Sequence, residues 1–94
     1  MHEKEITKEK LEGYFKVSET AFNLIKKKIK KGKEKEAKEI IEMADNYISD
    51  AHHFEKEGNF VNAFAALNYA HGWIDSGVRL GIFDVHDNKL FTVK

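Results

Sequence analysis

Residues 60–81 read FVNAFAALNYAHGWIDSGVRLG, a stretch with the spacing of an α-helix. Apolar side chains recur at intervals of three and four on one side, which predicts a helix packed on a core; they belong to Phe60, Ala63, Leu67, Ile74 and Val78. Small and aromatic residues repeat on roughly the opposite side, and they are Ala65, Tyr69, Gly72 and Ser76, with Trp73 and Leu80 at the edge. We therefore expect a helix over about residues 60–80 that is covered on both sides.

Two glycines, Gly72 and Gly77, lie inside this predicted helix. A glycine in a helix interior lowers the stability of the helix by about 1 kcal/mol relative to alanine. A glycine in such a place is typical of a point where another backbone or a ligand comes close. We predict a close approach at both positions.

Two further helices precede this one. The first is predicted after Thr7 as N-cap and extends to about Lys30, with a seam formed by Leu11, Phe15, Ser18, Phe22, Ile25 and Ile29. Gly32 is expected to end it in a left-handed turn. The second is predicted over about residues 33–57, with inward positions at Ala37, Ile41, Ala44, Ile48 and Ala51. Gly58 then stops the second helix and Asn59 caps the third.

The short connections between these segments determine the predicted architecture. Consecutive helices joined by tight turns run antiparallel, so we expect an all-α, up-down-up three-helix bundle in a single domain, residues 1–94. In the tail, residues 82–94, apolar and polar residues alternate well enough to predict a short hairpin that pairs segments 82–85 and 90–93. Because an isolated hairpin is marginal in water, we expect the tail to pack on its own bundle rather than on a partner chain.

Composition excludes several classes of site. The 94-residue chain has no cysteine, which rules out disulfides and thiolate metal ligands, and 34% of its residues are charged. No apolar run is long enough for a membrane span, and the first residues are too polar for a signal peptide. We therefore expect a cytoplasmic protein without a membrane partner. No cofactor or metal motif is present either.

The charges are unevenly distributed although the net charge is zero: residues 1–35 hold 11 lysines and 6 glutamates. Lysines concentrate between Lys26 and Lys35, a segment that could attract nucleic acid. We interpret them instead as solvated residues that complement the dipole at the end of the first helix. Weak nucleic-acid binding is kept as an alternative function.

His71, Asp75 and Arg79 recur every four residues and form a polar column along the third helix. An imidazole held by a carboxylate, beside a guanidinium, could bind a small molecule or act as a general base. We favour a structural column of hydrogen bonds, since no nucleophile motif is near. Asp50, His53 and Glu57, and likewise His52 and Glu55, are expected to be solvated rather than metal-binding.

Residues 68–81 carry the motif N-Y-A-x-G-W-I-D-x-G-V-R-L-G, and residues 57–63 read EGNFVNA. Both segments resemble a family of short archaeal proteins with an uncharacterised domain, and the resemblance extends over most of the chain. It implies a closed up-and-down three-helix bundle. It implies no activity or site residue.

The outward side of the third helix is therefore the best candidate for a functional surface. We expect Tyr69, Gly72, Trp73 and Ser76 to dock another protein or a second copy of the chain. No catalytic residue is assigned, and a non-catalytic interaction domain is the favoured interpretation.

Overall fold

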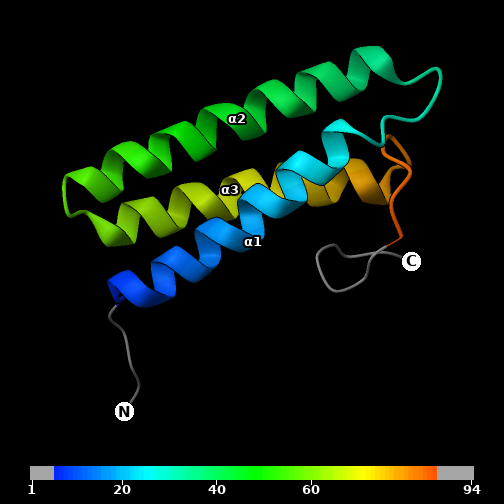
Figure 1. Cartoon of the computed structure of the whole chain (residues 1–94). Helices are drawn as coiled ribbons and strands as arrows, with labels where there is room; N and C mark the ends of the chain where they lie inside the picture. The colour runs from blue at the N-terminus through cyan, green and yellow to red at the C-terminus, as the bar shows by residue number, and fades with distance from the viewer. Residues whose placement is uncertain (1–5, 87–94) are drawn as a thin grey trace.

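Three antiparallel helices make up the computed structural model, which describes residues 6–86 (Figure 1). They are α1 (Lys8–Lys26), α2 (Glu34–Lys56) and α3 (Phe60–Arg79). The described residues contain no strand beyond one isolated antiparallel bridge between Ile29 and Phe83. The predicted all-α, up-down-up bundle is therefore confirmed. Within these residues, no helix combines the length and apolar character needed to cross a membrane.

Side chains cap the first and third helices as the sequence predicts. The Lys10 amide donates to Thr7 Oγ1 over 3.1 Å. At the start of α3, the Asn62 amide donates to Asn59 Oδ1 over 3.2 Å. Each bond satisfies one of the amides that a first helical turn leaves without an internal acceptor. The helices therefore begin where local sequence alone places them.

The end of α1 differs from the prediction, because the helix stops at Lys26 and not near Lys30. The Lys30 amide donates to the Ile82 carbonyl over 3.0 Å, and the Asp84 amide donates to the Lys28 carbonyl over 2.7 Å. These bonds to the tail satisfy backbone groups that a longer helix would have used itself. Gly32, with φ of 89°, therefore turns the linker toward α2 and does not end α1.

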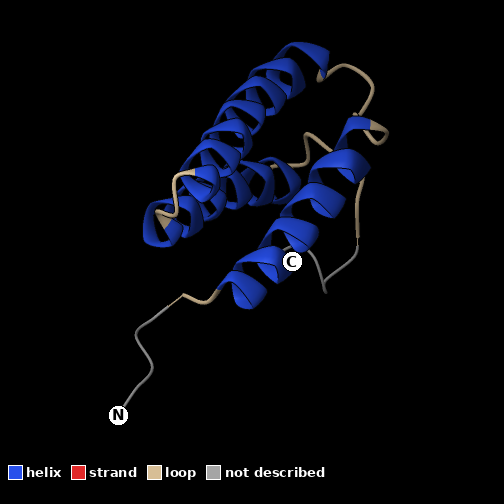
Figure 2. Cartoon of the chain, turned by 60° about the vertical axis from the view of Figure 1, so that its left-hand side comes forward, coloured by secondary structure: helices blue, strands red, loops and turns tan. Residues whose placement is uncertain are grey.

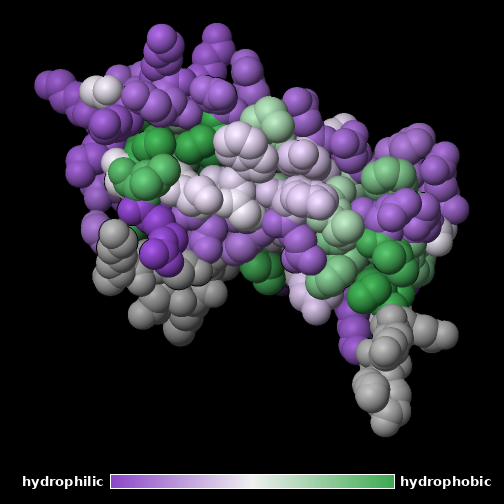
Figure 3. Space-filling view, turned by 180° about the vertical axis from the view of Figure 1, so that it is seen from behind, coloured by the Kyte–Doolittle hydropathy of each residue, from purple (hydrophilic) through white to green (hydrophobic). Residues whose placement is uncertain are grey.

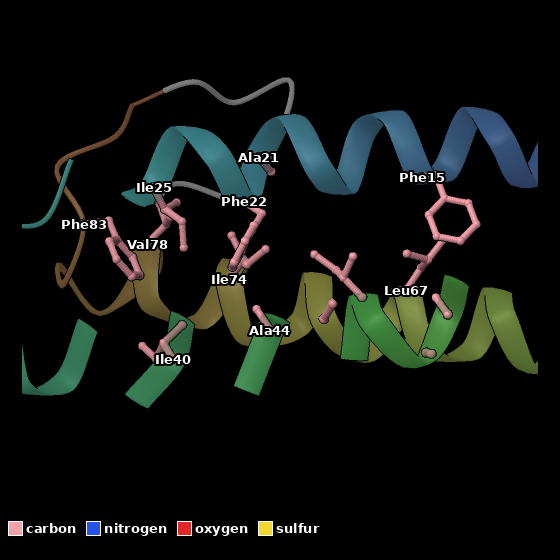
Figure 4. Packing of buried hydrophobic residues seen from close by; sticks show 14 of the residues in the cluster. Phe15, Ala21, Phe22, Ile25, Ile40, Ala44, Leu67, Ile74, Val78 and Phe83 are labelled. Carbon is pink, nitrogen blue, oxygen red and sulfur yellow. The ribbon is translucent and has the colours of Figure 1, made fainter. Parts of the chain in front are cut away.

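Helix α3 is the shared element of the bundle, because α2 packs most extensively on it and α1 and α2 meet least (Figure 2). Ala37, Ala44 and Ala51 are fully buried on α2. Small side chains spaced seven residues apart allow the two helix axes to approach closely. The larger core side chains come from α1 and α3 as well as α2 (Figure 4). At the α2 margin, Ile40 is buried whereas the predicted Ile41 is only half-buried.

The described part of the tail packs on its own bundle, as expected. Gly81, with φ of 77°, turns the chain back after α3. Phe83 is then only 2% exposed and lies near Ile25 and Val78 in the core (Figure 4). The tail pairs with the linker between α1 and α2 through the bridge. The second half of the predicted hairpin, residues 90–93, lies outside the described residues.

Gly77 is explained by this tail. A Cβ at Gly77 would lie 2.6 Å from the Phe83 ring and 2.9 Å from Ile40 Cδ1. The close approach is made by two side chains, and not by the backbone or ligand that the sequence suggested. Gly72 is different, because a Cβ there would meet no neighbouring segment within 4 Å.

Alanine substitutions of the two glycines of α3 are therefore expected to change the free energy of unfolding in opposite directions. Gly77→Ala is expected to lower the free energy of unfolding by about 1–2 kcal/mol, because the buried Phe83 ring has little room to move. Gly72→Ala is expected to raise it by up to about 1 kcal/mol through helix propensity. Urea unfolding of dilute protein, followed by circular dichroism, measures both. Equal effects of the two substitutions would contradict the packing of the tail.

Candidate interaction surface

The four predicted surface residues, Tyr69, Gly72, Trp73 and Ser76, line one hollow on the outward side of α3. Its volume is about 390 Å³, and Asn68 completes its lining. The space-filling view from behind shows a pale band of weak hydropathy between strongly hydrophilic margins (Figure 3). We call this surface the α3 outer face and define it by Ala65, Asn68, Tyr69, Gly72, Trp73, Ser76 and Leu80.

Much of the α3 outer face is open to solvent. Tyr69 is 63% exposed and Leu80 is 73% exposed, Gly72 and Ser76 are also exposed, and Trp73 is half-buried. Tyr47 of α2 extends the surface by stacking on Tyr69, with 5.3 Å between ring centroids. The sequence predicted that this side of the helix would be covered. Up to His86, the tail instead packs at Gly77 on the inner side.

Asn68 is the lining residue that sequence reasoning missed. It precedes Tyr69 and is exposed, but it falls outside the four-three-four spacing that identified its neighbours. Its amide is a donor and an acceptor at the edge of an otherwise apolar and hydroxyl-bearing hollow. The only available signal was its place beside Tyr69 and Gly72 on a helix.

Two residues of the polar column on α3 border different hollows in the described part of the chain. His71 borders a hollow of about 200 Å³ between α1 and α3, together with Tyr14 and Ser18. Arg79 borders a separate hollow of about 200 Å³ at the other end, with Lys30 and His86. Asp75 borders neither of these two hollows. In these two hollows, His71 and Arg79 are thus separated from each other, and a joint site with Asp75 stays a hypothesis.

The histidines of α2 pair with carboxylates at the protein surface. His52 Nε2 lies 2.7 Å from Glu19 Oε2 on α1, and since an ionised carboxylate can only accept, the imidazole N–H donates. The His52 ring also stacks on Phe15, with centroids 4.3 Å apart. His53 lies 3.3 Å from Glu57 one turn along. The described residues hold no group of three His, Cys, Asp or Glu side chains placed to bind a metal.

The bond between His52 and Glu19 joins α1 and α2, the two helices that contact each other least. A groove of about 510 Å³ lies between α1 and α2, lined by this pair together with Phe22, Asp45 and Ile48. Sequence reasoning missed the pair because its members are 33 residues apart. Helical spacing relates residues within one helix and not across two.

A protein-family model described as "Protein of unknown function (DUF357)" matches residues 13–83 of the chain. No curated protein and no solved structure matches the chain. The matched segment begins within α1 and ends at Phe83, so it includes the α3 outer face and the buried tail residues Ile82 and Phe83.

We expect the coupling between His52 and Glu19 to be small, because both side chains are more than 40% exposed. A double-mutant cycle with His52→Gln and Glu19→Gln should give a coupling energy of about 0.2–1 kcal/mol at near-neutral pH. The pair His53 and Glu57 on α2 is the matched control, for which about 0.3–0.5 kcal/mol is expected. A coupling well above about 2 kcal/mol for the first pair would show that it secures α1 to the bundle.

Proposed function

Since the chain belongs to the DUF357 family of unknown function, we propose a function from its geometry: it is a non-catalytic self-association module. The α3 outer face of one copy packs against the same face of a second copy. The observation that carries this proposal is the open hollow at Gly72, on a helix whose outward side is nearly free of charge. The partner that we propose for the α3 outer face is therefore a second copy of this chain.

Charge separates α3 from its neighbours. Its 20 residues include two charged side chains, Asp75 and Arg79, whereas the 19 residues of α1 include seven and the 23 residues of α2 include ten. The centres of protein interfaces are depleted in charge. Without charges near the two-fold axis, the face can also meet its own copy without placing a side chain opposite a like charge. This favours self-association over binding to a strongly charged partner.

The residues of the α3 outer face are also complementary to themselves. In an antiparallel pair of α3 helices, a two-fold axis between Gly72 and Trp73 places Tyr69 of one copy opposite Ser76 of the other. The same axis places the exposed Leu80 of one copy opposite Ala65 of the other. Large side chains thus meet small ones in one register, and both contacts occur twice.

The glycine at position 72 is a further argument for a contact with a second molecule. The packing of the described residues does not require a glycine there, because a Cβ would have free space around it. A mid-helix glycine nonetheless lowers helix stability by about 1 kcal/mol. A second helix backbone that approaches at Gly72 accounts for a residue that intramolecular packing leaves unexplained.

Self-association is tested by sedimentation equilibrium from about 1 μM to about 1 mM protein. We expect a monomer–dimer equilibrium, and the emission of Trp73, the only tryptophan, should shift to shorter wavelength as the dimer forms. Gly72→Leu fills the hollow and should weaken association at least tenfold, which corresponds to about 1.4 kcal/mol.

Gly13→Leu is the matched control, because Gly13 is an exposed glycine inside α1 that also borders free space. It should leave the dissociation constant within about twofold of that of the unmodified chain. A monomer throughout the concentration range would overturn the proposal. Equal weakening by both substitutions would overturn the assignment to the α3 outer face.

A further inference from the structure

Cationic side chains gather at the end of the bundle that holds the linker between α1 and α2. Residues 26–36 and 79–86 contain eight lysines and arginines against three carboxylates, Glu34, Glu36 and Asp84. We call the cationic group the basic tip; it consists of Lys26, Lys27, Lys28, Lys30, Lys31, Lys33, Lys35 and Arg79. All eight are exposed. The chain as a whole has no net charge, so any attraction for an anion is local to this end.

The helix dipole does not account for the basic tip. Because α1 ends at Lys26, the lysines at positions 28, 30, 31 and 33 lie beyond its last turn, where the stabilising effect of a cation has fallen off. The bridge to the tail holds this part of the linker in place instead.

Among the described residues, the lysines of the basic tip form no ion pair with a carboxylate. The four close carboxylate pairs between described residues all join the carboxylate to a histidine. The Gly32 amide instead donates to the Glu34 carboxylate, whose two oxygens lie 3.1 and 3.2 Å from the Gly32 nitrogen. Asp84 lies 3.1 Å from His86 Nε2. Two of the three carboxylates at this end, Glu34 and Asp84, thus interact with other groups.

Three segments distant in sequence contribute to one hollow at the basic tip. Lys30 comes from the linker, Arg79 from α3 and His86 from the tail, and they border a volume of about 200 Å³ together with Asp84. Lysine is a flexible point charge, whereas the guanidinium of arginine can hold two oxygens of one phosphate group. This combination is suited to a chain of phosphates.

We infer that the basic tip binds the phosphate backbone of a nucleic acid without sequence preference. Binding of this kind is driven by the release of counterions as lysines and arginines neutralise phosphates. A lipid surface is a weaker match, because peripheral proteins usually lay an amphipathic helix flat on it. In this protein, by contrast, the cationic side chains lie on a linker and around a hollow, and not along one face of an amphipathic helix. No base-reading contact is proposed, since Phe83, the ring at this hollow, is buried.

Fluorescence anisotropy with a labelled single-stranded RNA and a labelled DNA duplex of about 20 nucleotides tests the inference, in salt from about 50 to 200 mM. The full chain is compared with a variant that carries Lys28→Gln, Lys30→Gln and Lys31→Gln. The control carries Lys8→Gln, Lys10→Gln and Lys56→Gln, which are exposed lysines from the opposite end of the bundle. Both variants lose the same total charge.

We expect micromolar binding at the lowest salt concentration, with an affinity that falls steeply as salt is added. The tip variant should bind at least tenfold more weakly, and the slope of log affinity against log salt should be about 2–3 smaller in magnitude. The control should stay within about twofold of the unmodified chain.

Three results would overturn the inference. One is an absence of binding to either nucleic acid at about 50 mM salt. Another is an equal loss in the tip variant and the control, which would indicate a general charge effect. The third is tighter binding to polyglutamate, or to vesicles rich in phosphatidylserine, than to both nucleic acids.

Discussion

The contact between the Phe83 ring and the backbone at Gly77 closes one end of the bundle, and the arrangement of that end depends on it. Only a residue without a side chain allows the ring to come so near to α3. With Phe83 buried beside Ile25 and Val78 (Figure 4), the tail is in position to bond to the linker at Lys28 and Lys30. The end of α1 and the position of the linker follow from this single packing contact.

The helices were predictable because their signals are local. Apolar residues at intervals of three and four mark the buried sides of α1 and α3, and Thr7 and Asn59 act within one turn of the amides that they cap. The true end of α1 was not predictable, because its competitor for hydrogen bonds is the tail, far away in sequence. Gly72 and Gly77 look alike in the sequence. They differ only in what lies against them after folding.

Four of the five residues that line the hollow on α3 were predictable as neighbours, whereas their exposure to solvent was not. Helical spacing alone places Tyr69, Gly72, Trp73 and Ser76 around one hollow. Whether that hollow is open depends on the path of the tail, which turns inward at Gly81. The polar column followed the same spacing but lies along the margin of the helix. His71 and Arg79 therefore border separate hollows, and periodicity could not distinguish these outcomes.

The bridge between Ile29 and Phe83 also orders the events of folding. Helices α2 and α3 are joined by a short turn, so their contacts form with little loss of chain entropy. The bridge joins residues more than about fifty positions apart and requires nearly the whole chain. During synthesis the linker between α1 and α2 thus stays unpaired until Phe83 has emerged from the ribosome. Because the linker and the tail hold each other through these bonds, we expect them to open together in the folded protein, as one unit of local unfolding.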